Sequence, residues 1–110
     1  MLPPAARLTS GESFRRCVRS GARAGSRTMV LHLADAEQGP PRVGFVVSRA
    51  VGGAVVRNRV RRRLRHLVRE RLVDLPVASV AVVRAKPAAA DASYAELRRD
   101  LARCLDRVLV

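Results

Sequence analysis

The residues with the clearest chemical capacity are arginines crowded into the stretch 57–69. Guanidinium groups make planar, bidentate contacts with phosphates. At helical spacing, four of these arginines share one face with an asparagine: Asn58, Arg61, Arg62, Arg65 and Arg69. Only Glu70 supplies an acidic neighbour, so the row repels itself unless a polyanion lies against it. The pattern favours an anion-binding helix over a solvated charged face.

The other face of the same stretch is apolar, which tells us what positions the arginines. Its members recur at steps of three and four residues: Val56, Val60, Leu64, Leu67 and Val68. Gly53 is a tolerable N-cap, and the pattern fades near Asp74. We therefore predict a helix with one side packed on a core and the other presenting its charges.

Composition points to a folded protein with an anionic partner. The chain has 110 residues, 48% of them hydrophobic, and a formal net charge of +13. We expect a single domain, residues 1–110, that binds nucleic acid or, as second choice, an anionic membrane surface. Nearly all the positive charge is arginine, which suits RNA.

No segment predicts a membrane span, because the apolar runs are far shorter than the roughly 20 residues required. The N-terminus lacks the apolar core of a signal peptide. Cys17 and Cys104 fit no metal-ligand spacing and sit among apolar helical positions, so we expect small core residues. A cytoplasmic location with reduced thiols is the simplest interpretation.

Catalytic groups are scarce. The acidic residues are scattered, and Glu96 and Asp100, at i,i+4 near arginines, are expected on a solvated helix face. His66 lies on the basic face, where RNA contact is favoured over catalysis. His32 alternates with core residues on a strand and is expected at the surface or in a cleft. The residues favour binding, without catalytic side chains.

The remaining pattern predicts the element order α-β-β-α-β-α. Thr9 and Glu12 form an expected capping box for a first helix, and Ser93 and Glu96 another for the last. The helices are expected over 10–20, 53–74 and 93–108, and the strands over 28–33, 42–48 and 77–83. The first two strands could pair as an antiparallel hairpin, and the third reads as a central strand buried on both faces.

The stretch RVGFVVSRAVGGAVVRNRVRRRLR, residues 42–65, resembles the signature of the bacterial ribonuclease P protein component. The R-N-R block, Arg57-Asn58-Arg59, is highly specific in this context. The resemblance extends to Arg7-Leu8, Phe14 and Ser93-Tyr94, so it covers nearly the whole chain.

The resemblance implies a fold for the chain and a catalytic role for an RNA subunit. The fold is an α+β (α/β) sandwich, like domain 2 of ribosomal protein S5, with a left-handed β-α-β crossover, whereas general rules favour the right-handed form. The RNA subunit of ribonuclease P would be the catalyst and would remove the 5′ leader of precursor tRNA. Mg²⁺ would be held mainly by RNA, and no small-molecule cofactor or membrane is implied.

The resemblance also implies two binding regions. With Arg69 added from the helical pattern, the residues expected to bind the catalytic RNA are Arg57, Asn58, Arg59, Arg61, Arg62, Arg65 and Arg69. Those expected to line a cleft for the 5′ leader are Phe14, Val18, Val30, His32, Val46, Ser48 and Arg49. Val18 and His32 stand where many relatives carry aromatics, Ala50 replaces a second basic residue, and Gly53 replaces the usual asparagine.

Three alternatives remain open on the residues alone. A small ribosomal-type RNA-binding protein with no role in tRNA cleavage would use the same helix structurally. A helix-turn-helix regulator would need a partner helix before the arginine helix, at a short turn that is absent here. A protein-only nuclease would cleave without an RNA subunit.

Overall fold

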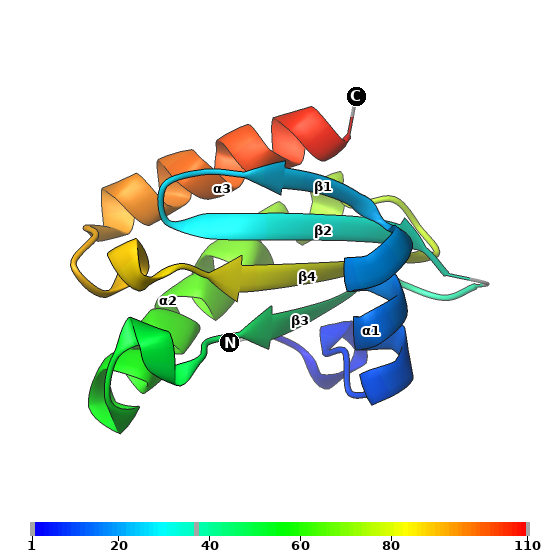
Figure 1. Cartoon of the computed structure of the whole chain (residues 1–110). Helices are drawn as coiled ribbons and strands as arrows, with labels where there is room; N and C mark the ends of the chain where they lie inside the picture. The colour runs from blue at the N-terminus through cyan, green and yellow to red at the C-terminus, as the bar shows by residue number, and fades with distance from the viewer. Residues whose placement is uncertain (1, 37, 110) are drawn as a thin grey trace.

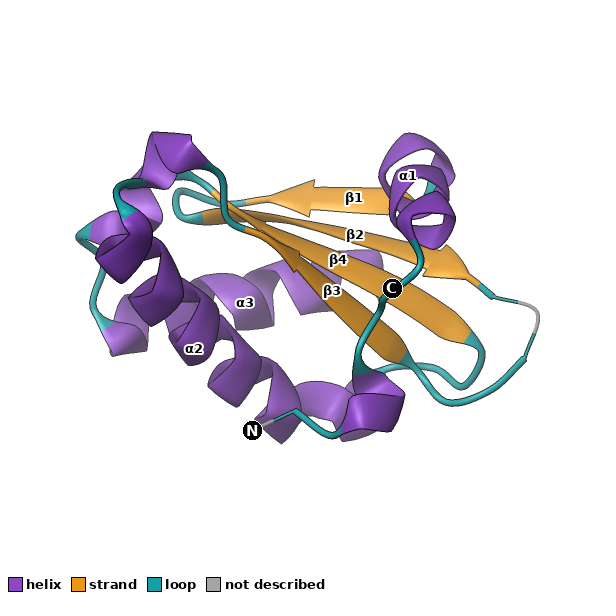
Figure 2. Ribbon diagram, turned by 90° about the horizontal axis from the view of Figure 1, so that it is seen from below, coloured by secondary structure: helices purple, strands orange, loops and turns teal. Residues whose placement is uncertain are grey.

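A computed structural model describes residues 2–36 and 38–109. A four-stranded sheet carries one helix on one face and two helices on the other (Figures 1 and 2). In chain order the elements are α1 (Gly11–Ser20), β1 (Ala22–Gly25), β2 (Met29–Asp35), β3 (Arg42–Val46), α2 (Ala54–Arg71), β4 (Ser79–Ala85) and α3 (Tyr94–Val108). Short 3₁₀ helices are η1 (Pro4–Ala6), η2 (Arg49–Val51), η3 (Leu72–Asp74) and η4 (Pro87–Ala90).

The strands lie in the order β1-β2-β4-β3. β2 pairs antiparallel with both β1 and β4, and β3 pairs parallel with β4. The expected hairpin between the strands at 28–33 and 42–48 is therefore wrong. β4 lies between them because its nearly continuous apolar run is buried on both faces and belongs at the centre of the sheet.

β1 is an additional strand that the sequence pattern did not predict. Its residues Ala22–Gly25 show no apolar alternation, and three of the four are exposed. The strand is defined by its pairing with Val30–Leu33 of β2 rather than by its own composition. The observed order is thus α-β-β-β-α-β-α within the expected α+β class.

The connection from β3 through α2 to β4 is left-handed. In Figure 1 both strands point left, β4 lies above β3, and α2 lies behind the sheet; Figure 2 shows α1 alone on the opposite side. The crossover agrees with the family resemblance and departs from the general preference for right-handed connections.

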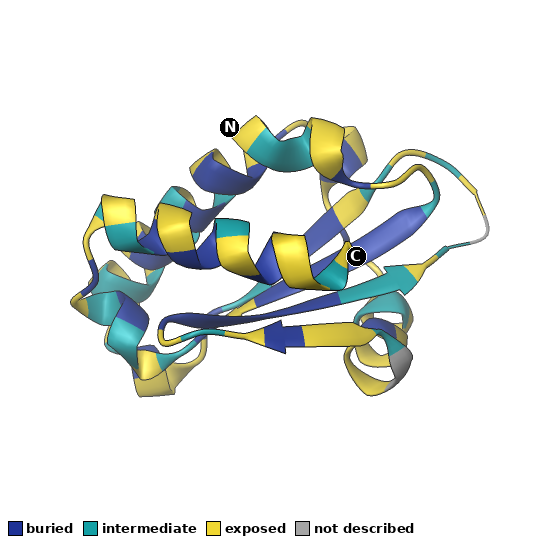
Figure 3. Cartoon of the chain, turned by 90° about the horizontal axis from the view of Figure 1, so that it is seen from above, coloured by how far each residue is buried: buried dark blue, intermediate teal, exposed yellow. Residues whose placement is uncertain are grey.

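The two faces of the sheet bury unequal cores. The side covered by α2 and α3 holds the larger cluster, with Val60, Leu64 and Leu67 of α2 at 0–1% exposure. The α1 side holds a smaller cluster built around Leu8, Cys17, Val80 and Val82. Figure 3 shows the resulting pattern on the helices, with buried positions facing the sheet and exposed positions outside. The predicted apolar face of α2 is confirmed.

The helix starts show how far capping can be predicted. Ser93 and Glu96 form the expected capping box of α3, and Gly53 is the N-cap of α2, without a side-chain cap. The expected cap of α1 is wrong by one residue: Ser10, not Thr9, accepts a hydrogen bond from the Ser13 amide, at 3.3 Å. Adjacent residues of the same chemical kind make this choice ambiguous in the sequence.

Asp100 corrects the expectation of a solvated face on α3. Its side chain is 5% exposed, and Oδ2 accepts hydrogen bonds from the Thr28 amide at 3.2 Å and the Thr28 hydroxyl at 2.6 Å. The carboxylate thus ties α3 to the start of β2. Cys17 and Cys104 are free and buried, as expected, and burial raises the pKa of both thiols.

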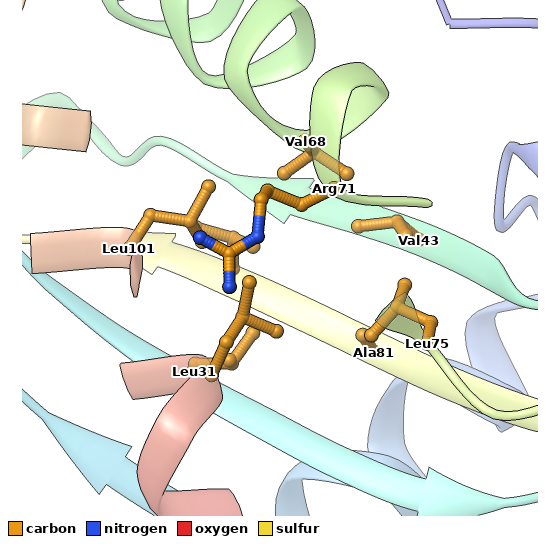
Figure 4. A pocket seen from close by; sticks show the side chains of 9 residues that line it. Leu31, Val43, Val68, Arg71, Leu75, Ala81 and Leu101 are labelled. Carbon is orange, nitrogen blue, oxygen red and sulfur yellow. The ribbon is translucent and has the colours of Figure 1, made fainter. Parts of the chain in front are cut away.

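A small gap remains between α2, α3 and the sheet (Figure 4). Its volume is about 10 Å³, and its lining is apolar apart from Arg71, which lies beside Val68 and Leu101. A space of this size holds at most about one water molecule. It is a packing gap rather than a ligand site.

Candidate nucleic-acid interface

The outer face of α2 carries guanidinium groups that the protein's own acids do not neutralise. Among residues 2–36 and 38–109, no carboxylate forms an ion pair with any of the predicted RNA-binding arginines. The only acid in the helix, Glu70, lies instead 3.9 Å from His66 and 3.7 Å from Arg98. The unpaired charges remain available to an anionic partner.

α3 shows what a balanced helix looks like in the same chain. α2 contains eight arginines and one glutamate, whereas α3 contains four arginines and three acids. Arg98 and Arg99 of α3 both lie near carboxylates, and Glu96 pairs with Arg27 at 2.5 Å. The contrast makes α2 the stronger candidate for polyanion binding.

The predicted RNA-binding residues of α2 differ in their contacts. Arg62 and Arg69 are exposed, and neither has a partner among the described residues. The Asn58 amide oxygen accepts a hydrogen bond from Arg61 at 3.0 Å. Arg59 donates to the Ala90 carbonyl at 3.1 Å, so it also tethers the segment that precedes α3. The face is therefore partly preorganised before any ligand arrives.

Arg65 points from α2 towards the other predicted binding region. It lines a hollow of about 200 Å³ together with Arg7, Phe14, Gly44 and Phe45, among others. Phe14 lies directly on Gly44, where an added Cβ would come within 2.1 Å of the ring. Glycine at this position is what allows the aromatic ring to reach the sheet.

The residues predicted for the leader cleft gather on the α1 side of the sheet. The register places them in rows across neighbouring strands: His32, Val82 and Gly44 in one row, and Val30, Arg84 and Val46 in the next. Phe14 covers the first row at Gly44. The structure thus brings Phe14, Val30, His32 and Val46 into one region from three separate segments.

These residues are not equally accessible. Val30 is 4% exposed and His32 2%, so both form the floor of the region and offer almost no contact area. His32 was expected at the surface or in a cleft, and its burial corrects that expectation. Val18 is 39% exposed, Phe14 and Val46 are half-buried, and Ser48 and Arg49 are exposed. Direct contacts would fall on this second group.

Arg84 is the residue that the sequence analysis missed. It is an exposed residue of β4 and lies between Val30 and Val46 in the sheet. The expected strand ended at Val83, although Arg84 continues the every-second-residue spacing of Val80 and Val82 on the α1 side. That alternation was the available signal, and it was hidden by the nearly continuous apolar run.

His32 has an unusual environment on this face. Neither ring nitrogen has a hydrogen-bond partner among the described residues. Burial lowers the pKa of His32, and the positive charges of Arg84 and Arg23 lower it further. The neutral imidazole is therefore favoured in the folded protein. The two neighbouring cations form no ion pair with a carboxylate among the described residues.

The described residues offer no cluster of three or more histidine, cysteine, aspartate or glutamate side chains that could hold a metal ion. No helix in this part of the chain is both long and apolar enough to cross a bilayer. The two neighbouring regions present cationic groups on α2 and an aromatic ring on the α1 side of the sheet. Cations bind the phosphates of RNA and aromatic rings stack on its bases.

Comparison with known proteins decides the family. The Ribonuclease P family profile matches residues 2–109. The chain belongs to the ribonuclease P protein family. The ribonuclease P protein component of Nocardioides sp. is 60% identical over 111 residues, which cover 98% of this chain and 95% of the relative. That of Streptomyces griseus is 52% identical over 118 residues, covering 99% and 96%.

A solved ribonuclease P protein from Staphylococcus aureus has the same fold, with a TM-score of 0.84 and 25% identity. The alignment covers 96% of this chain and 99% of that one. Family membership confirms the resemblance and assigns the chain to the ribonuclease P ribonucleoprotein, which processes tRNA 5′ ends. The alternative of a ribosomal-type protein with no role in tRNA cleavage loses its support.

Proposed function

We propose that the outer face of α2 binds the catalytic RNA of ribonuclease P and that the RNA carries out the cleavage. The observation that carries this proposal is the absence of ion-pairing carboxylates around the predicted RNA-binding arginines within residues 2–36 and 38–109. An uncompensated row of guanidiniums is costly alone and favourable against a phosphate backbone. Arg57, Asn58, Arg59, Arg61, Arg62, Arg65 and Arg69 are the proposed contacts.

The second part of the proposal is that the α1 side of the sheet binds the 5′ leader of precursor tRNA. Apolar or aromatic contact area comes from Phe14, Val18 and Val46. Exposed polar groups come from Ser48, Arg49 and Arg84. A single strand is bound in this way by ring stacking combined with backbone phosphate contacts. Val30 and His32 support the region from beneath.

The cleavage itself is assigned to the RNA, with Mg²⁺ held mainly by RNA. The described residues offer no metal-binding cluster, and the two buried thiols have raised pKa values, which favour the unreactive protonated form. The protein would act as one domain, residues 1–110, in the cytoplasm. Its contribution would be to neutralise phosphates and to hold the leader, which lowers the Mg²⁺ concentration that the RNA needs.

Reconstitution tests the proposal directly. A bacterial ribonuclease P RNA is assayed for leader removal from precursor tRNA at low Mg²⁺, with and without the chain. We expect cleavage to depend on the protein at low Mg²⁺ and to become independent of it as Mg²⁺ is raised. Cleavage by the protein without RNA would show a protein nuclease, and cleavage by RNA that the protein never improves would refute the cofactor role.

A further inference from the structure

A basic recess lies between α2 and the first turns of α3, beside the predicted RNA-binding face. Its volume is about 380 Å³, and its lining residues are Arg62, Arg63, His66, Glu70, Tyr94 and Arg98. Three guanidiniums, an imidazole and a phenol ring face one carboxylate there.

Contacts within the protein hold the walls of the recess in place. The Arg98 guanidinium carbon lies 5.2 Å from the centre of the Tyr94 ring, a cation–π distance. The ring of His66 meets that of Tyr94 edge-on, with centroids 6.2 Å apart. Arg63 donates to the Ala92 carbonyl at 3.3 Å. Ordered cations lose less entropy when a ligand binds.

The recess holds more positive charge than its one carboxylate can neutralise. Glu70 is its only carboxylate, at 3.7 Å from Arg98 and 3.9 Å from His66, which is longer than a hydrogen bond. Arg62 has no partner among the described residues. An anion entering the recess would therefore meet the unpaired Arg62 guanidinium of α2 and, from α3, the Arg98 guanidinium, which it would share with Glu70.

We propose that this recess binds a phosphodiester group of the RNA that α2 faces, so that the RNA-binding surface extends onto α3. The inference rests on the proposed function. Arg62 belongs both to the outer face of α2 and to the recess, so a polynucleotide that follows α2 reaches Arg98 without leaving the protein. Arg62 and Arg98 hold the phosphate from opposite walls, and Tyr94 keeps Arg98 in position.

The test compares two arginines of the same helix. Arg98→Ala removes a guanidinium from the recess. Arg103→Ala removes a guanidinium that lies outside the recess, is exposed and has no interaction partner among the described residues. Binding to a bacterial ribonuclease P RNA is measured over a series of salt concentrations. For Arg98→Ala we expect roughly tenfold weaker binding and a salt slope lower by about 0.7–0.9, the value for one lost phosphate contact. Arg103→Ala should retain the wild-type slope.

A second variant pair tests the positioning role of the ring. Tyr94→Leu leaves the net charge unchanged but removes the cation–π contact, and Tyr94→Phe retains it. We expect weaker RNA binding for Tyr94→Leu and wild-type binding for Tyr94→Phe, with thermal unfolding measured on both to show that they are folded.

The outcomes separate this inference from the proposed function. Failure of the wild-type protein to bind the RNA would refute both. Wild-type binding with an unchanged salt slope in Arg98→Ala would overturn the recess alone. Equal losses in Arg98→Ala and Arg103→Ala would show that only total charge matters, which would also overturn it.

Discussion

The two predicted binding regions are built in opposite ways. On α2 the functional side chains lie on one continuous helix and carry charge that the described acids leave unpaired, although the Nε atom of Arg57 is buried and has no hydrogen-bond partner among the described residues. On the α1 side of the sheet the residues come from separate segments, and two of them, Val30 and His32, are buried. We expect the first region to supply strong, salt-dependent affinity and the second a weaker contribution that depends on the leader.

The largest effect should follow the removal of charge from α2. Replacing Arg61, Arg62 and Arg65 together by alanine should weaken binding to ribonuclease P RNA at least about a hundredfold, since a charged hydrogen bond is worth roughly 1.5–3 kcal/mol. The slope of log affinity against log salt should fall by about 2, at roughly 0.7 per contact. Filter binding over a salt series measures both quantities.

The matched control removes the same charge from α3 by replacing Arg99, Arg103 and Arg107 by alanine. Circular dichroism should show that both proteins remain helical. Equal losses of affinity in the two triple variants would mean that net charge determines RNA binding. The proposal that the face of α2 is the specific binding surface would then be wrong.

A smaller effect should follow from making α2 resemble α3. Asn58→Asp is nearly isosteric and can still accept the hydrogen bond from Arg61, but it places a carboxylate three and four residues before two arginines. We expect RNA binding to weaken about five- to tenfold, because a nearby negative charge repels phosphate by roughly 1 kcal/mol or more at contact distance. The measurement is the equilibrium affinity at fixed salt.

Asn58→Ala serves as its control, because it removes the hydrogen bond without adding charge. It should weaken binding less than Asn58→Asp does. If both variants bind alike, the added carboxylate has no effect of its own, and the loss they share is the amide N–H donor of Asn58, because only Asn58→Asp retains the acceptor for Arg61.

These α2 features could be predicted from the sequence because a helix relates residues three and four positions apart. Val60, Leu64 and Leu67 identify the buried side, and the arginines between them must lie on the other. The α1 side of the sheet could not be predicted equally well. Its rows depend on the register of strands far apart in the chain, and the wrong hairpin between 28–33 and 42–48 would have given the wrong neighbours.

The same reason explains the other misses. β1 forms through its pairing with β2, and Asp100 is buried because α3 packs where Thr28 presents an amide and a hydroxyl. The packing of Phe14 on Gly44 is likewise a contact between distant segments. Each of these three contacts depends on tertiary packing, which cannot be predicted from the local periodicity of the sequence.

A leader-dependent effect should come from Phe14. Phe14→Leu retains an apolar side chain against Gly44 but removes the ring, and base–aromatic stacking is worth about 1–3 kcal/mol. We expect the reconstituted holoenzyme to bind precursor tRNA about fivefold or more weakly, with mature tRNA bound as before. An equal loss for both substrates would place Phe14 outside the leader site.

A pH effect should come from His32. Its pKa is lowered in the folded state by burial and by Arg84 and Arg23, so the unfolded chain takes up a proton first as the pH falls. The stability associated with neutral His32 is present above the ordinary histidine pKa of about 6.5 and is lost as the pH falls from there towards the lower folded pKa. Urea unfolding between pH 7 and pH 5 measures it.

His32→Val removes the titrating group while retaining a strand-forming, apolar side chain. The variant should lose the His32 part of the decline in unfolding free energy over this pH range. A decline as steep as that of the wild type would show that His32 is not its source.

The smallest effect concerns the start of α2, where the family resemblance implies asparagine and this chain carries Gly53. Gly53 has extended backbone angles, φ −70° and ψ 177°, and an added Cβ would meet nothing within 4 Å, so asparagine fits without strain. Its side chain could accept a hydrogen bond from an amide of the first turn, which now has no side-chain cap. Gly53→Asn should therefore raise the unfolding free energy by only a few tenths of a kcal/mol, measured by urea denaturation. Because the cap lies outside the arginine row, RNA affinity at fixed salt should stay unchanged; tighter binding with the same salt slope would mean that the RNA also contacts this end of the helix through the uncharged amide.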